Sequence, residues 1–582
     1  MISKTPQFDK EIKKVLKEFV PHERKCLWFG KHPHCEKDFN IGEEDIKFLK
    51  MFRVPAPNYC PTCRRMRRLV HLTVSRLFKN KCEAPGHNEN IISIFPRECP
   101  FPVYDYKYYI SDEFDPFIFG EDYNDKINPI EQLLNLRKKF PMPSFLNRNP
   151  SDVNSDYANG GRDVKNGYYA VGCYHAEDIW YTIHTNKSRN IMDSDAVNES
   201  DLVYKGISSD HLYNSSFVYF SSSCTDSMFL FDCRNCTDCF GCVNLRNAKY
   251  QVFNKQLKKE EYKDFMKSLK PFSRKVLEEN HKKFWDLVKS LPMNGTRIIA
   301  SNNVSGVKIS NSKNLFDVTD TINSENVRHA DGVLSNKDSM DFLYSGGNSS
   351  LLYMNTNIGS QSSKVKFSVS SKFCTDCEFV FNSKNLNNCF MCFGLQNKSY
   401  CILNKQYREE EYFKIIDDIK VEMLKRGEYQ DGPGFEFSAQ AYNFSLGQSL
   451  YPLTEDKIID LGGYIAKEVE TNIEGLDILT ADQLPEIIDE VSDDILDKAI
   501  ICEKTKRPFK LISSEIAFLK RMGLPLPTTH PSVRMEENWN FAPLARKYKT
   551  TCRKCNKEME SVFGPEREFN LYCEDCYKRE VF

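Results

Sequence analysis

Short apolar and aromatic runs recur along residues 151–405, and most are preceded by a polar triplet that ends in Asp or Asn. Examples are "AEDIWYTI", "CTDSMFLF" and "CTDCFGC", whose triplets end at Asp178, Asp226 and Asp238 at steps of about eleven or twelve residues where the pattern is unbroken. Asn and Asp suit corners because they tolerate left-handed backbone angles and hydrogen-bond within their own turn. A short period of strand and turn is typical of a β-solenoid, and we predict a mainly β, parallel β-helix-like fold with helical segments.

The width of one coil depends on the side chains that it encloses. A coil of about twelve residues has so narrow a core that only small side chains fit inside, whereas "IWYTI" and "MFLF" present Trp, Tyr and Phe. We therefore expect about twelve residues to form one face and about twenty-three to form one coil.

The repetitive region is itself duplicated. "NKQLKKEEY" (254–262) matches "NKQYREEEY" (404–412), and Cys224 matches Cys374 at the same offset. Helix-forming segments follow each copy, and we expect them to cap the open end of each solenoid, whose unpaired edge would otherwise invite aggregation. The pattern predicts an N-terminal helix (1–25), an N-terminal zinc module (26–110), a linker (111–150), β-solenoid 1 (151–255), a helical insert (256–295), β-solenoid 2 (296–405), a helical or irregular cap (406–465), an acidic linker (466–500) and a C-terminal zinc-ribbon module (501–582).

The C-terminal module contains two C-x2-C pairs, Cys552 with Cys555 and Cys573 with Cys576. This spacing is typical of a zinc ribbon, in which two turns joined by a hairpin supply four thiolates to one tetrahedral ion. Four protein ligands leave no position for water, so we predict a structural and not a catalytic zinc site.

The N-terminal module is related to the C-terminal one. "DIKFLKMFRVPAPNYCPTCR" (45–64) aligns with "EIAFLKRMGLPLPTTHPSVR" (515–534), and the same offset pairs His32 with Cys502. We expect an N-terminal zinc site made of His32, Cys35, Cys60 and Cys63, with Cys26 as the rival of His32 because its C-x8-C spacing to Cys35 is unusual.

The two modules are expected to have lost opposite sites of a two-site ancestor. The N-terminal copy keeps Cys82 of the second site, and the C-terminal copy keeps Cys502 and His530 as remnants of the first. Pro85, Asp105 and Tyr108 stand at the other second-site positions, and Cys82, His87 and Cys99 are the alternative set for a patched second site. We predict two structural Zn²⁺ ions per chain.

A basic stretch follows the N-terminal cysteine pair. Arg64, Arg65, Arg67 and Arg68 in "CPTCRRMRRL" form a candidate phosphate-binding surface for nucleic acid. The alternative is a solvated helix face that answers the acidic segment 486–497.

Composition favours reduced thiols and a cytoplasmic protein. The chain of 582 residues has 22 cysteines and a formal net charge of −1, so that any polyanion would have to bind a local patch. Its first twenty residues form a Lys-rich amphipathic pattern and not a signal peptide, and no apolar run is long enough for a membrane span. Cysteine pairs without an export signal point to zinc and not to a disulfide framework.

The densest cysteine cluster is "CRNCTDCFGC", with Cys233, Cys236, Cys239 and Cys242. The second copy retains cysteine only at the positions of the last two, so a four-thiolate cluster common to both copies is excluded. We interpret Cys239 and Cys242 as small core residues, with an extra metal or redox site as the alternative.

The phrases "VPAPNYCPTCRRMRR", "FGCVNLRNAKYQVFNKQ" and "YCEDCYKREVF" resemble large zinc-ribbon proteins encoded by candidate-phyla bacteria, over nearly the whole chain. In that family the second N-terminal site usually has four cysteines. The family has no assigned activity, so the resemblance implies architecture and zinc but no reaction.

Three functions compete at this point. The first is a zinc-binding scaffold or adaptor that presents a solenoid surface to a protein partner, with no membrane association. The second is nucleic-acid binding through the arginines. The third is a β-helix carbohydrate-active enzyme that uses acidic residues such as Asp193, Asp195, Asp317 and Asp320. The chain has no P-loop, H-E-x-x-H or G-x-S-x-G motif, so we expect no catalytic residues and favour the scaffold.

Overall fold

The structure is a computed structural model that describes residues 3–73, 76–146, 150–467, 473–541 and 546–581. The chain forms two compact units, and each unit combines segments that are far apart in sequence. The N-terminal unit contains the described residues of 1–144 and 296–467, with 546–547. The C-terminal unit contains those of 145–295, 473–541 and 548–581. Each unit therefore has one long sheet and one terminal cysteine module.

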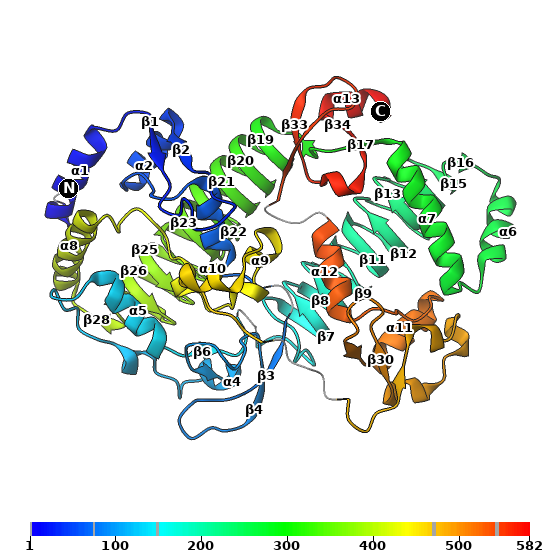
Figure 1. Ribbon diagram of the computed structural model, residues 1–582, viewed down its shortest axis with the longest axis horizontal. Coiled ribbons are helices and arrows are strands. Elements are labelled where there is room, and N and C mark those ends of the chain that lie inside the picture. Colours follow the sequence, from blue (N-terminus) through cyan, green and yellow to red (C-terminus); the bar gives the residue numbers. More distant parts are fainter. Residues whose placement is uncertain (1–2, 74–75, 147–149, 468–472, 542–545, 582) are drawn as a thin grey trace. The chain divides into compact units, whose positions relative to one another are not determined.

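The sheet of the C-terminal unit, here called the early sheet, has ten strands that run parallel except for the last pair (Figure 1). Its strands are β7 (Arg162–Val171), β8 (Tyr174–Ile183), β9 (Arg189–Met192), β10 (Asp195–Asn198), β11 (Asp201–Asp210), β12 (Tyr213–Tyr219), β13 (Met228–Phe231), β14 (Thr237–Val243), β15 (Lys249–Val252) and β16 (Lys255–Gln256).

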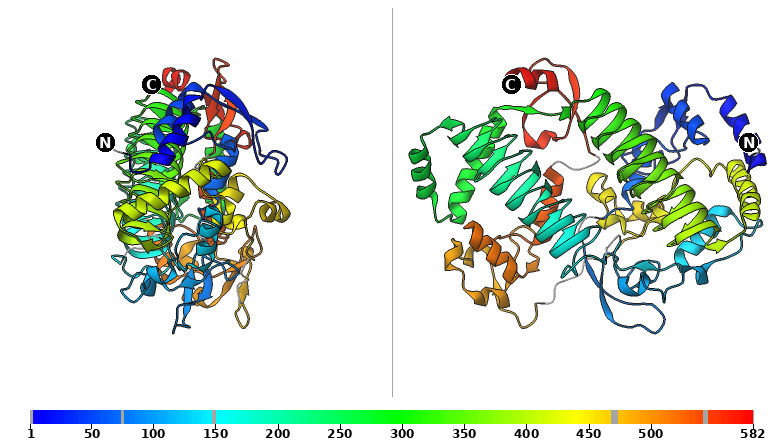
Figure 2. Two further views of the ribbon diagram at one scale, coloured as in Figure 1. Left: turned by 90° about the vertical axis from the view of Figure 1, so that its left-hand side faces the viewer. Right: turned by 180° about the vertical axis from the view of Figure 1, so that it is seen from behind.

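The sheet of the N-terminal unit, the late sheet, has eleven strands stacked in chain order, and again only the last pair is antiparallel (Figure 2). Its strands are β18 (Ile298–Ile299), β19 (Asn302–Ser310), β20 (Lys313–Ile322), β21 (Glu325–Leu334), β22 (Asn336–Ser345), β23 (Ser349–Ile358), β24 (Ser363–Lys366), β25 (Thr375–Phe381), β26 (Lys384–Phe393), β27 (Gln396–Ile402) and β28 (Lys405–Gln406). The structure thus confirms a strand-rich fold with helical segments and two long parallel sheets.

The register of these sheets corrects the expected coil length. Val203 pairs with Ser215, and Val327 pairs with Ser339, in both cases twelve residues further along the chain. The chain therefore returns beside itself after one step of twelve residues, and the expectation of about twenty-three was wrong.

The reason lies in which side chains point inward. Every third residue is buried in one continuous core, for example Ile191, Ser194, Val197, Ser200 and Val203. Left-handed φ angles also recur every third residue over long stretches of the early sheet, so the backbone turns at short intervals and does not follow the two-residue alternation of a flat strand. One step of twelve residues consequently supplies four inward side chains, and these are mostly small.

Serine and cysteine are interchangeable at these inward positions. Ser194 donates its hydroxyl hydrogen bond to the Met192 carbonyl and accepts one from the N–H of Gly206, twelve residues on. Cys233 donates to the Phe231 carbonyl in the same way, and its own N–H donates to the Ser221 hydroxyl. All four cysteines of "CRNCTDCFGC" are fully buried in this core, which agrees with the interpretation of Cys239 and Cys242 as small core residues.

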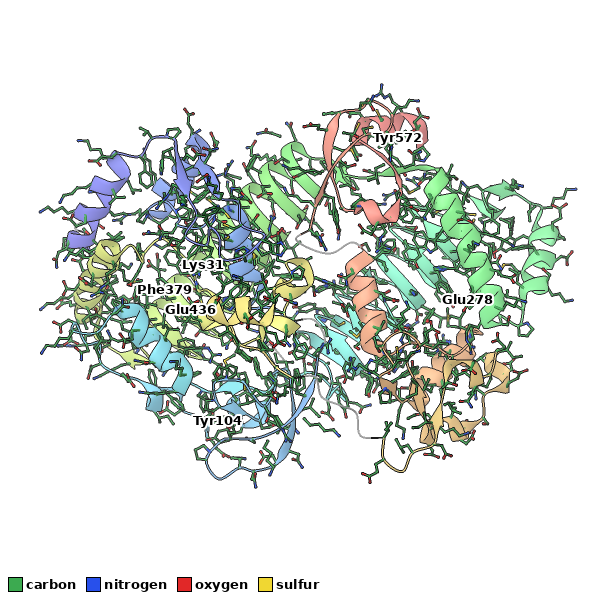
Figure 3. The ribbon with its side chains drawn as sticks, in the orientation of Figure 1. Lys31, Tyr104, Glu278, Phe379, Glu436 and Tyr572 are labelled. Atoms are coloured by element: carbon green, nitrogen blue, oxygen red, sulfur yellow. The ribbon has the colours of Figure 1, made fainter. Side chains whose placement is uncertain are left out.

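The large aromatic side chains lie outside this narrow core. Phe229 and Phe231 are fully buried, but their rings pack against Phe284 and Trp285 of the helix α7 (Arg274–Ser290). In the late sheet, Phe379, which Figure 3 labels, belongs to a similar aromatic row. The aromatic runs therefore indicate helices that pack on the outer face of the strands, and they do not indicate a wide solenoid interior.

Helices and small hairpins complete both units, and the segments after each sheet are helical as expected. The contacts of α6 with β15 and of α8 with β27 lie at the ends of the two sheets. Residues 111–150 and 466–500, expected to be linkers, contain α5 and the strands β29 and β30. The remaining elements are α1 (Pro6–Lys17), β1 (His22–Lys25), β2 (Asp38–Ile41), α2 (Glu43–Phe52), α3 (Pro61–Leu69), β3 (Phe78–Lys81), β4 (Asn90–Ser93), β5 (Val103–Tyr104), α4 (Tyr106–Tyr109), α5 (Pro129–Lys139), β6 (Met142–Pro143), α6 (Lys259–Leu269), β17 (Pro292–Asn294), α8 (Glu409–Arg426), α9 (Leu446–Leu450), α10 (Glu455–Asp460), β29 (Ile478–Leu479), β30 (Ala499–Ile501), β31 (Pro508–Phe509), α11 (Ser513–Met522), α12 (Pro531–Phe541), β32 (Tyr548–Thr551), β33 (Glu558–Ser561), β34 (Asn570–Tyr572) and α13 (Glu574–Val581).

Candidate metal centres

The C-terminal module brings its four predicted ligands together. Cys552 and Cys555 lie in the turn of the antiparallel hairpin β32–β33, and Cys573 and Cys576 lie between β34 and the first turn of α13. All four sulfur atoms are within 4.8 Å of one another, and the Sγ atoms of Cys555 and Cys573 are 3.8 Å apart. This spacing suits one tetrahedral ion with four thiolate ligands.

The backbone of this turn favours the ionised form of a thiol. The N–H of Cys573 donates to Cys552 Sγ at 3.2 Å, and further N–H groups of the turn point at the same sulfur. Burial raises the pKa of Cys552, but these hydrogen bonds outweigh it and lower the pKa to about 6. A thiolate is therefore available at neutral pH, and a thiolate is the form that binds metal.

The N-terminal module also forms a group of four thiols: Cys26, Cys35, Cys60 and Cys63. Cys60 is the N-cap of α3, where its sulfur accepts the N–H of Cys63, and its own N–H donates to Cys26 Sγ at 3.3 Å. Hydrogen bonds from the thiols of Cys60 and Cys63 lower the pKa of Cys26 to about 2. Cys35 lies with Lys31, which Figure 3 labels, in the connection between β1 and β2.

The fourth N-terminal thiol corrects the sequence prediction, which placed His32 in the group and Cys26 outside it. His32 lies beside the four sulfurs, with Nε2 3.3 Å from Cys63 Sγ and its ring edge-on to Trp28. Burial lowers the pKa of His32 to about 4, so the ring is neutral at pH 7. The geometry therefore favours Cys26 as the fourth ligand.

An insertion explains why the sequence comparison misled. Cys26 directly follows β1 and its N–H donates to Lys37, whereas Cys502 directly follows β30 and its N–H donates to Arg507. The two cysteines are thus structural equivalents, but the N-terminal turn is six residues longer, since 37 − 26 exceeds 507 − 502 by six. A constant offset consequently set His32, and not Cys26, opposite Cys502.

The remnant site of the C-terminal module keeps Cys502 and His530 but not the other two ligands. The N–H of His530 donates to Cys502 Sγ, as the N–H of Cys60 does to Cys26. Thr505 and Val533 occupy the other two ligand positions, so this site lacks the thiols that a closed site needs.

The four arginines proposed to contact nucleic acid are buried, so that prediction was wrong for this segment. Arg64 and Arg68 pair with Asp341 of β22 at 3.0 and 3.2 Å, and Arg65 pairs with Asp331 of β21 at 2.9 Å. Arg67 donates to the carbonyl of Gly432, and each of the four residues is less than one tenth exposed. They hold α3 on the late sheet. The alternative of a solvated helix face was also wrong.

The C-terminal module uses the matching contact on the early sheet. Arg534 of α12 pairs with Asp193 at 2.7 Å and with Glu515 at 3.0 Å, and all three side chains are buried. Arg534 corresponds to Arg64 in the alignment of the two modules. The repeats can be counted back along the register of each sheet, from Cys224 in the early sheet and from Cys374 in the late sheet. This count places Asp193 and Asp341 at the same position of equivalent repeats. The duplication thus preserved the docking of module on sheet.

The acidic residues considered for glycoside hydrolysis each lie beside an arginine, histidine or lysine side chain. Asp193 pairs with Arg534 as above, and Asp195 lies 3.4 Å from His184 Nδ1. Asp317 contacts His329 at 2.6 Å, and Asp320 contacts Lys308 at 3.3 Å.

A third group of metal-ligating side chains lies at the turn of the hairpin β3–β4. Cys82, His87 and Glu89 place their ligand atoms within 4.8 Å of one another. Cys99, which the sequence suggested as a ligand, is not in this group; its S–H donates to the Phe101 carbonyl. No sequence signal marks Glu89 as a ligand, because carboxylates are common in this chain and Glu89 belongs to no cysteine pair.

Comparisons with protein-family models, with curated proteins and with solved structures found no match. The fold and the two four-thiol groups therefore rest on the sequence and geometry of this chain alone. Among its described helices, none combines the length and the apolar character that crossing a membrane requires.

Proposed function

We propose that this protein is a zinc-stabilised scaffold that presents the face of a parallel β-structure to a protein partner. Each four-thiol group would bind one Zn²⁺, because four thiolates at tetrahedral spacing are the donor set of structural zinc sites. All 22 cysteines are free thiols, which supports a reducing compartment such as the cytoplasm. The chain would then belong with the large zinc-ribbon proteins that it resembles.

We further propose that both sheets are β-solenoids with a coil of twelve residues. Support comes from the register of twelve, from the inward position of every third residue and from the left-handed corners with the same spacing. Side-chain ladders of Asn and Asp, such as Asn154 to Asn166 and Asn166 to Asp178, stack along these corners. Such a repeat builds a long regular surface from local contacts, which suits binding more than catalysis.

The observation that carries the scaffold function is an open groove of about 710 Å³ on the early sheet. Charged side chains of successive repeats line it, including Lys187, Arg189 and Glu199. Tyr213 lies among them and is 49% exposed. Tyrosine and arginine are enriched where proteins bind one another, so we take a polypeptide of mixed charge as the partner.

Site-specific photocrosslinking tests this proposal. A photoreactive phenylalanine analogue replaces Tyr213, and the matched control places it at Ile478, which is 47% exposed in the same unit but outside the groove. In lysate of the source organism, we expect one saturable protein adduct at Tyr213 and none at Ile478. The adduct should disappear in Arg189→Glu, whose circular dichroism should match that of the parent. Equal labelling at both positions, or adducts that persist in Arg189→Glu, would refute the groove as the docking surface.

Metal analysis tests the zinc assignment separately. Protein purified without added metal should carry two tightly held zinc ions per chain, one for each four-thiol group. Iron or one ion per chain would contradict the assignment, whatever the crosslinking shows.

A further inference from the structure

The hairpin β3–β4 of the N-terminal module is the structural counterpart of the hairpin β32–β33 that carries the C-terminal metal site. Cys82 and Cys552 each directly follow the first strand of their hairpin. The N–H of Cys82 donates to the Glu89 carbonyl at 3.0 Å, and the N–H of Cys552 donates to the Lys557 carbonyl at 2.9 Å. The N-terminal turn is two residues longer, which changes the side chains that reach the sulfur.

Two of the backbone donors around the two sulfur atoms correspond, whereas Cys552 Sγ also accepts the N–H of Cys555, whose counterpart Pro85 has no N–H. Cys82 Sγ accepts the N–H of Asp105 at 3.2 Å, and Cys552 Sγ accepts the N–H of Cys573 at 3.2 Å. A second N–H comes from the turn itself, from Ala84 in one module and from Lys554 in the other. Cys82 Sγ thus accepts two of the backbone hydrogen bonds that Cys552 Sγ accepts.

The other three ligands of the closed site have been replaced. Pro85, Asp105 and Tyr108 occupy the positions of Cys555, Cys573 and Cys576, and Figure 3 labels Tyr104 and Tyr572, which directly precede Asp105 and Cys573. Asp105 uses its carboxylate to cap α4 and does not point to the sulfur. No second thiol therefore accompanies Cys82.

His87 and Glu89 from the longer turn place their ligand atoms within 4.8 Å of Cys82 Sγ. His87 Nδ1 and Glu89 Oε1 are 3.0 Å apart, and the His87 ring lies 4.6 Å from the ring of Tyr108, between ring centroids. Their side chains are 31% and 47% exposed, whereas Cys82 is buried. One thiol, one imidazole and one carboxylate thus converge at the rim of the module.

We propose that Cys82, His87 and Glu89 form a third metal site, which binds Zn²⁺ with three protein ligands and leaves one position open to solvent. Sulfur, nitrogen and oxygen donors together suit an ion of borderline softness such as Zn²⁺ or its substitute Co²⁺. Three ligands and one exchangeable position distinguish this site from the two closed four-thiol groups. We expect its ion to bind more weakly and to exchange faster.

Cobalt titration of the full chain tests this site. Protein that holds two zinc ions is titrated with Co²⁺, and thiolate-to-cobalt absorption is followed. We expect one further equivalent of Co²⁺, with a spectrum that shifts when azide is added, because azide replaces the solvent ligand. No further equivalent, or a third ion whose spectrum ignores azide, would overturn the proposal of an open site.

Surface variants identify the ligands without disturbing the core. His87→Ala and Glu89→Gln should each weaken the binding of the third ion by about 100-fold or more, which exceeds the usual effect of a residue behind the ligands. The matched controls, His22→Ala and Glu98→Gln, alter residues of comparable exposure in the same unit and should leave the affinity unchanged. If the controls weaken binding as much as the site variants do, the third ion lies elsewhere. The two tightly held ions should remain in all four variants, so this test is independent of the proposed scaffold function.

Discussion

The contact of Arg534 with Asp193 and Glu515 gives a quantitative test of how the C-terminal module is held. The guanidinium group lies 2.7 and 3.0 Å from the two carboxylates, and the three side chains are 5%, 1% and 0% exposed. Arg534→Met removes the guanidinium charge that these two carboxylates share and leaves both carboxylates buried. Removal of one partner from a buried ion pair costs about 3–5 kcal/mol.

Hydrogen exchange measured by mass spectrometry resolves this cost in space. A global unfolding free energy is poorly defined for a chain of two units, so the opening free energy of individual peptides is the suitable quantity. We expect it to fall by about 3–5 kcal/mol in α11, α12 and β8, and to stay constant in the late sheet. Lys289→Met is the control, because the Lys289–Glu568 pair of the same unit is exposed and screened by solvent, so its loss should leave the opening free energies of these peptides unchanged.

The same experiment can refute the reasoning. A loss below about 1 kcal/mol in α12 for Arg534→Met would mean that the buried pair does not anchor the module. Adding Asp193→Asn to Arg534→Met should recover part of the stability, since it removes one of the unpaired charges. A double variant that is less stable than Arg534→Met alone would show that the charge is not the cause.

Three more predictions follow from the site and the core. Cys26→Ser should reduce the tightly bound zinc from two ions per chain to one, whereas His32→Ala should leave two; the reverse result, by elemental analysis, would restore His32 as the ligand. Burial lowers the pKa of His71 to about 3, so the folded protein resists its protonation; stability is full above the ordinary pKa of about 6.5 and declines as pH falls toward 3, by about 2 kcal/mol between pH 7 and 5. His71→Gln should flatten this decline in the opening free energy of α3, and an unchanged slope would exclude His71 as the cause. Cys239→Phe should destabilise β14 by about 3 kcal/mol or more, whereas Cys239→Ser should cost about 1 kcal/mol; equal exchange rates in the two variants would contradict the narrow core.

The internal duplication includes the contact by which each module packs on the sheet of its own unit. The N-terminal module packs on the late sheet, and the C-terminal module packs on the early sheet, each within its own unit. In each case the buried arginine that ends the aligned segment pairs with an aspartate of an equivalent repeat. Because the order along the chain is module, sheet, sheet, module, neither unit is a continuous segment.

Local patterns in the sequence were sufficient to predict the repeat and the C-terminal metal group. Asn and Asp at regular steps predicted corners with left-handed backbone angles, and the structure has such corners at Asp178, Asp226 and Asp238. Two C-x2-C pairs required a pair of tight turns, which a hairpin and a helix start provide. These features depend on residues close in sequence, so spacing alone reveals them.

The coil length, the fourth N-terminal thiol and the fate of the arginines were decided by tertiary structure. Phe229 and Phe231 are apolar whether they point into a narrow core or outward beneath α7, and only the packed helix distinguishes the two. Because the N-terminal turn is longer by six residues, Cys26 lies in the four-thiol group, although an alignment at constant offset favoured His32.

The arginines show the physical reason most directly. From the sequence, Arg64 is expected to be a surface charge. Its partner in the folded chain is Asp341, which lies 277 positions away and which the sequence does not reveal. Burial of a charge is favourable only when an opposite charge lies in contact with it, and that contact exists only after α3 has packed on the late sheet. The sequence by itself determined the repeat, the corners and the cysteine turns; the folded chain decided which side chains meet.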